Sequence, residues 1–162
     1  MIKMLAIIAI SICILLSNAY PLYEPTKSNV AELNPKYFDI QIIQARTKTG
    51  TSFVHFYKKD DLKSHNYKNE INKLASDYDG MFKIAAVNCE EFRELCDKQE
   101  VREFPTFKIY PPLPAPVFPY EGEIESKSII ASLGRFVDNK VTEIHSGNID
   151  TFLQEKANIP KI

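Results

Sequence analysis

Short apolar segments alternate along this chain with segments whose apolar residues recur every three or four positions. Residues 52–57 and 82–87 are mostly apolar runs rich in β-forming side chains, which predict buried strands of a sheet. Between them, residues 62–78 place their apolar side chains on one face of a helix, with Asp60 or Asp61 as its N-cap. A brief strand at residues 30–33 is expected to precede another helix.

The second half of the chain continues this alternation and then ends it with a hairpin. A short helix is predicted at residues 90–99, two strands at 106–110 and 117–120, and an amphipathic helix at 126–137. Four prolines at residues 111–116 join the two strands, which favours a stiff connection and leaves a docking loop for a partner as the alternative. The order of elements predicts an α/β domain with a mixed sheet.

The N-terminal residues have the composition of a signal peptide. Lys3 precedes an apolar run at residues 4–16, and the small residues Ser17 and Ala19 follow it, so we expect residues 1–19 to be removed before Tyr20. The run is shorter than the roughly 20 residues of a membrane span, and no stable membrane insertion is expected after cleavage. Residues 20–27 are predicted to form a loose leader. The endoplasmic reticulum lumen or the exterior is the expected location, although no Lys-Asp-Glu-Leu type signal ends the sequence.

Charge and histidine spacing exclude several classes of function. The formal net charge is −1 with both signs interspersed, so no nucleic-acid partner is expected. The three histidines, His55, His65 and His145, show no spacing of metal ligands, and there is no glycine-rich phosphate loop. We therefore expect neither a metal nor a cofactor. His55 lies mid-strand, where a neutral core histidine is favoured over a pH switch.

Two cysteines, Cys89 and Cys96, remain once Cys13 leaves with the signal peptide. An even number in an oxidising compartment favours a disulfide between them. A redox-active pair is the alternative, but the acidic neighbours disfavour a reactive thiolate. These neighbours are Glu90, Glu91, Glu94 and Asp97.

Four segments, at residues 53–57, 87–89, 101–106 and 120–122, resemble a thioredoxin domain of the protein disulfide isomerase family. The resemblance implies a thioredoxin fold over residues 28–138, with a central mixed sheet flanked by helices and a cis-proline loop at Phe104-Pro105-Thr106. The tail, residues 139–162, is similar to the start of a second thioredoxin-like unit, which would form a short C-terminal extension.

The positions that serve redox chemistry in this family carry other residues here. The two cysteines of the C-x-x-C pair, the buried glutamate, the lysine near it and the arginine after the Tyr-x-Gly turn fall, in that order, on Asp61, Ser64, His55, Ala86 and Ile124. Because a thiolate is the nucleophile in disulfide exchange, the resemblance implies the scaffold without its usual chemistry, and no catalytic residue is expected.

Peptide binding is the function that the retained residues favour. In the family, the backbone before the cis-proline pairs with an extended peptide. Phe104 and Pro105 keep that feature, and Leu62 supplies an apolar neighbour. The expected partner is a client peptide or protein during folding or escort. Weak disulfide exchange through Cys89 and Cys96, or a structural adaptor role in a secreted complex, are the alternatives.

Overall fold

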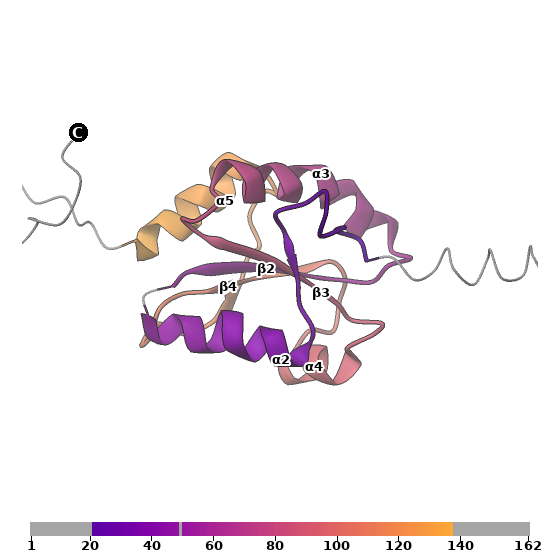
Figure 1. Cartoon of the computed structure of the whole chain (residues 1–162), viewed down its shortest axis with the longest axis horizontal. Coiled ribbons are helices and arrows are strands. Elements are labelled where there is room, and N and C mark those ends of the chain that lie inside the picture. Colours follow the sequence, from indigo (N-terminus) through magenta and orange to yellow (C-terminus); the bar gives the residue numbers. More distant parts are fainter. Residues whose placement is uncertain (1–20, 49, 138–162) are drawn as a thin grey trace, which may run out of the picture.

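The computed structural model of this chain describes residues 21–48 and 50–137 (Figure 1). The signal peptide expected at 1–19 and the extension expected at 139–162 lie outside the described residues. Five strands form one mixed sheet in the order β1-β3-β2-β4-β5. The strands are Ala31–Glu32 (β1), Ser52–Tyr57 (β2), Lys83–Asn88 (β3), Thr106–Tyr110 (β4) and Phe118–Pro119 (β5). The sheet and its flanking helices confirm the expected thioredoxin fold.

Helices cover both faces of the sheet. α3 (Leu62–Asp77) and α5 (Ser126–Leu133) pack on one face, and α2 (Pro35–Phe38) and α4 (Arg93–Lys98) pack on the other (Figure 1). All six residues of β2 are buried between these layers, which explains why the strand has no alternating polar positions. Within the described part of the chain, no helix combines the length and apolar character needed to cross a membrane.

Strand register aligns the end of β2 with the end of β3 and the start of β4. β2 pairs in parallel with β3, where Tyr57 faces Asn88, and antiparallel with β4, where Phe56 faces Thr106. The segments that follow β2 and β3 therefore meet the segment that precedes β4 at one edge of the sheet, which we call the carboxyl edge. The proline loop after Tyr110 lies at the opposite edge, because Tyr110 pairs with Ser52.

Several predicted elements differ in extent from the structure, among them the strand expected at 30–33, which is β1, and the helix expected at 90–99, which is α4. The helix expected after residues 30–33 is α2, which Asn34 caps, and it continues as a π-helix at Asp39–Ile43 (η1) and a 3-10 helix at Gln44–Lys48 (η2). The predicted strand at 117–120 is reduced to the two residues of β5, and the prolines that flank and occupy it have no N–H to donate to a ladder. α5 ends at Leu133 and is followed by a 3-10 turn at Gly134–Phe136 (η3).

Part of the leader that was predicted to be loose, Leu22 and Tyr23, is instead packed into the molecule, whereas residues 25–27 are exposed. Leu22 and Tyr23 are only 4% and 0% exposed and belong to the core beneath α3. The Leu22 N–H donates to the Tyr57 hydroxyl at 3.1 Å, and the Tyr23 N–H donates to Oε1 of Glu32 at 3.0 Å. The sequence interpretation weighed the polar residues and prolines of this segment and overlooked its two large apolar side chains.

The proline loop is tied to η2 through Arg46. The Arg46 guanidinium donates to the carbonyl oxygens of Pro111 and Ala115, and the Arg46 carbonyl accepts from the Leu113 N–H at 3.1 Å. These bonds hold both ends of the loop against one helix. The loop therefore forms a fixed connection, while the Leu113 side chain is 55% exposed.

Candidate functional site

Asp61 and Ser64, which the resemblance places at the C-x-x-C positions, lie at the N-terminus of α3 and bond to each other. Asp61 is the N-cap, and its Oδ2 accepts from both the N–H and the hydroxyl of Ser64, each at 2.8 Å. Ser64 is fully buried. The bond from the Ser64 hydroxyl, followed by that from its amide, lowers the pKa of the Asp61 carboxyl. The pair thus satisfies orphan donors of the first helical turn.

His55, which the resemblance places at the position of the family's buried glutamate, lies in the middle of β2. Its side chain is fully buried, and Nδ1 lies 2.8 Å from the Tyr23 hydroxyl. The imidazole stacks on the Phe107 ring with 4.5 Å between centroids. Burial lowers the pKa of His55 to about 3, against an opposing effect of the Asp61 charge, so the ring is neutral near pH 7. This agrees with the expectation of a neutral core histidine.

Ala86 and Ile124, which the resemblance places at the positions of the family's lysine and arginine, have apolar side chains. Ala86 is fully buried in β3 and lies directly opposite His55 in the strand register. Ile124 is half-buried and packs against the core beneath α3 and α5. The structure therefore brings His55 and Ala86 side by side, and neither Ala86 nor Ile124 offers a group that exchanges protons.

Phe104-Pro105 lies at the carboxyl edge with a cis peptide bond, as the resemblance implied. Beside it is a hollow of about 330 Å³, which we call the cis-proline groove. Its walls include Lys63 and Tyr67 from α3, and Tyr120 and Ile124 from the segment after β5. The sequence interpretation did not assign Lys63, Tyr67 or Tyr120 to the site, because their spacing predicts only a helix face and a strand end.

The backbone of Phe104 is unpaired at this groove. Its N–H and C=O make no hydrogen bond to any residue of the described part of the chain, whereas the neighbouring Glu103 carbonyl accepts from the Thr106 hydroxyl at 2.6 Å. The half-buried Phe104 ring faces the ammonium of Lys58, which lies 4.7 Å from the ring centroid. A free donor and acceptor beside an open hollow can pair with an added extended strand.

Leu62 is less closely involved in the groove than the sequence indicated. Its side chain is 79% exposed at the start of α3, and the groove is lined by the next residue, Lys63, rather than by Leu62. Covering such an exposed apolar side chain with a partner is favourable, because it removes apolar surface from water. Leu62 therefore lies outside the groove wall, next to Lys63 in the sequence.

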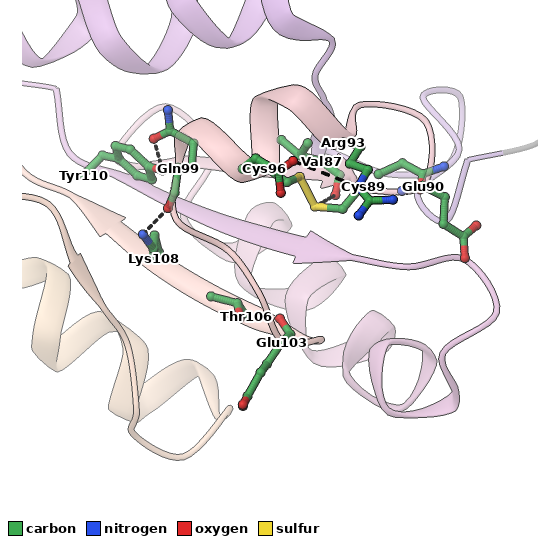
Figure 2. Close-up of a disulfide and its surroundings, with 12 residues drawn as sticks. Val87, Cys89, Glu90, Arg93, Cys96, Gln99, Glu103, Thr106, Lys108 and Tyr110 are labelled. Carbon is green, nitrogen blue, oxygen red and sulfur yellow. Dashed lines mark hydrogen bonds and ion pairs between the residues drawn. A yellow bond between two sulfur atoms is a disulfide. The ribbon is translucent and has the colours of Figure 1, made fainter.

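Cys89 and Cys96 form a disulfide with an S–S distance of 2.00 Å, which joins the end of β3 to α4 (Figure 2). Both residues are buried, at 4% and 2% exposure. From α4 the chain returns to β4 through Gln99, whose side chain accepts from the Tyr110 hydroxyl at 2.9 Å. Lys108 also donates to the Gln99 carbonyl. The disulfide and these bonds fix the segment that leads into Phe104.

A half-buried acid, Glu32, which the sequence interpretation did not single out, lies near the leader. Oε1 of Glu32 accepts from the Tyr57 hydroxyl at 2.8 Å as well as from the Tyr23 N–H. Burial raises the pKa of Glu32 to about 7, although these two hydrogen bonds oppose the rise. The group serves the packing of the leader and lies in β1, away from the cis-proline groove.

Comparison with known proteins relates this arrangement to larger proteins. A protein disulfide-isomerase-like protein of Dictyostelium discoideum is 29% identical over 132 residues, which cover 78% of this chain and 32% of that protein. The DnaJ homolog subfamily C member 10 of Homo sapiens is 31% identical over 102 residues, covering 63% of this chain and 13% of that protein. The chain therefore spans a third or less of the length of these relatives.

Solved structures and a family model agree on the fold. A crystal structure of ERdj5, in its form II, matches with a TM-score of 0.71 and 26% identity over 84% of this chain and 18% of that chain. The family model described as Thioredoxin matches residues 29–135. With the five-stranded sheet and the cis-proline loop, this match shows that the chain belongs to the thioredoxin family.

Proposed function

We propose that this protein is a thioredoxin-like binding module of the secretory pathway, which holds client peptides or a partner protein and does not exchange disulfides. One observation carries the proposal: the unpaired backbone of Phe104 borders an open groove at a helix N-terminus whose thiol positions are Asp61 and Ser64. Pairing with a peptide backbone needs that groove and no thiolate. The similarity to disulfide-isomerase-like proteins supports a role in folding or escort, and the apolar N-terminal run supports the location.

Peptide binding is tested by substituting Phe104 in the groove and Leu62 outside its wall. The probe is a fluorescein-labelled, extended peptide of alternating Val and Thr with one central Phe, and fluorescence anisotropy gives its Kd. Phe104→Ala removes an aromatic anchor, and we expect binding to weaken about tenfold or more. Leu62→Ala should weaken binding by about twofold to threefold, because only the burial of one side chain outside the groove wall is lost.

Leu113→Ala provides the matched control for the binding experiment. Like Leu62→Ala, it truncates an exposed leucine, but in the proline loop at the opposite edge of the sheet, so the Kd should not change. If Leu113→Ala loses binding while Phe104→Ala retains it, the groove is not the binding site, and the adaptor role through the proline loop is favoured. Circular dichroism of each variant establishes that it is folded.

The second candidate is weak disulfide exchange through Cys89 and Cys96. It is favoured by one observation: the disulfide and Phe104 line the same hollow. Against it, both cysteines are almost fully buried, and an exchange reaction begins with attack on an accessible sulfur. The binding module remains the better supported function.

A further inference from the structure

A second hollow meets the cis-proline groove at Phe104. This α4 pocket has a volume of about 450 Å³, and Phe104 lines both hollows while their other lining residues differ. Its apolar floor consists of the Cys89–Cys96 disulfide and Val101, all of which are buried. Such a volume admits a side chain of a bound peptide together with its hydration.

Three cations surround this floor. Lys58, Arg93 and Arg102 are all exposed, and neither Lys58 nor Arg102 forms an ion pair with a residue that the structure describes. Arg93 has one ionic partner, Asp97, at 4.0 Å, and the two side chains are 87% and 67% exposed. An exposed pair at that distance contributes little, so the guanidinium can turn to another carboxylate.

Figure 2 shows Arg93 beside the disulfide, with Glu90 next to it. Glu90 and Asp97 are the acids of the pocket, and Asp97 already faces Arg93. One cation therefore offsets Asp97, one offsets Glu90, and one positive charge remains for a ligand. Beside the apolar floor, this excess favours an anionic side chain over a neutral or basic one.

The cis-proline groove has the opposite charge balance. Its charged lining residues are Glu103, Glu121 and Lys63, which leave a negative excess. A peptide that crosses Phe104 thus meets acids on one side and bases on the other. An acidic residue of that peptide is repelled from the groove and attracted to the α4 pocket, which fixes the side on which it binds.

We propose that the α4 pocket selects client peptides that carry an Asp or Glu side chain next to the segment paired with Phe104. This selection rests on the peptide binding proposed above. Successive residues of an extended peptide rise by about 3.3 Å, so a residue two positions from the one at Phe104 reaches the neighbouring hollow. Its carboxylate then binds the ammonium of Lys58 and the guanidinium of Arg102, which can donate two parallel hydrogen bonds.

The test compares three versions of the Val/Thr peptide with its central Phe. They carry Glu, Gln or Lys two residues before the Phe in one series and two residues after it in another. We expect one Glu peptide to bind the full chain about fivefold to tenfold more tightly than its Gln counterpart, and the Lys peptide to bind more weakly than Gln. The preference should disappear in K58Q/R102Q and persist in K127Q, where an exposed lysine of α5 is neutralised.

The outcomes separate this inference from the proposed function. If Glu and Gln peptides bind with Kd values within twofold in both series, yet Phe104→Ala abolishes binding, the groove stands and the selection is overturned. A Glu preference that survives in K58Q/R102Q overturns it as well, because the carboxylate is then bound elsewhere. If none of the peptides binds the folded protein, the proposed function fails and the inference fails with it.

Discussion

Asp61, Ser64 and His55 each have a hydrogen-bond partner where the family carries reactive groups. Asp61 and Ser64 form an N-cap pair, and His55 bonds to Tyr23. At the residue scale, Asp61 and Ser64 satisfy each other and Nδ1 of His55 pairs with the Tyr23 hydroxyl, whereas the buried Nε2 of His55 has no hydrogen-bond partner among the described residues. A buried polar group without a partner costs about 1–3 kcal/mol, so the hydrogen bonds of Ser64 and of Nδ1 of His55 each avoid a cost of that size.

A buried group, His55, and a half-buried one, Glu32, give the stability of the fold opposite dependences on pH. Burial lowers the pKa of His55 from 6.5 to about 3, so its contribution is fully present above pH 6.5 and is lost as pH falls toward 3. Burial raises the pKa of Glu32 from 4.5 to about 7, so its contribution is fully present below pH 4.5 and is lost as pH rises through 7. Between pH 4.5 and 6.5 the two effects oppose each other.

His55→Gln should separate these effects. Glutamine keeps a hydrogen-bonding group for the Tyr23 hydroxyl and does not titrate. Between pH 7 and pH 5, we expect the free energy of unfolding of the variant to rise relative to the native protein by about 1–2 kcal/mol. Urea unfolding at both pH values measures it, with His65→Gln, an exposed position on α3, as the control. Parallel changes in the native protein and His55→Gln would contradict a buried neutral imidazole.

At the scale of elements, the leader behaves as part of the core. Tyr23 contacts His55 and Tyr57 edge-on, with centroids 5.9 and 6.2 Å apart, and packs with Leu22 beneath α3. The first strand of the sheet, β1, is only two residues long. Burial of the leader therefore supplies apolar contacts that such a short strand does not.

Tyr23→Ala tests the packing of the leader. Truncating a fully buried aromatic side chain costs about 3–5 kcal/mol. The control is Tyr37→Ala, because Tyr37 is 49% exposed on α2 and its truncation should change stability by about 0.5 kcal/mol or less. Both free energies come from urea unfolding. Equal, small losses in the two variants would mean that the leader is loose after all.

Hydrophobic periodicity was sufficient to predict the central strands, the long helix and the fold class. β2 and α3 have long, regular patterns, and their predicted bounds match the structure closely. The leader was missed because Leu22 and Tyr23 are two adjacent apolar residues without a period. The groove walls were missed because Lys63 and Tyr120 meet only through tertiary packing, which no local pattern encodes.

At the scale of the whole molecule, the charged residues are unevenly distributed over the surface although the net charge is close to zero. The formal net charge is −1, yet the residues that line the α4 pocket have a positive excess and those that line the cis-proline groove have a negative excess. Both lie at the carboxyl edge, while the proline loop is fixed at the other edge by Arg46. One edge of the sheet thus gathers the features that can bind a peptide.

Binding without exchange is tested most directly by one fluorescence measurement on the native chain. A peptide of the Val/Thr type, joined to a second copy by a disulfide that quenches its fluorophores, is mixed with glutathione with and without the protein. We expect anisotropy to rise with protein concentration while the rate of unquenching stays at the rate measured with glutathione alone. An acceleration that Cys89→Ser/Cys96→Ser abolishes would contradict this expectation and assign the chain to the oxidoreductases.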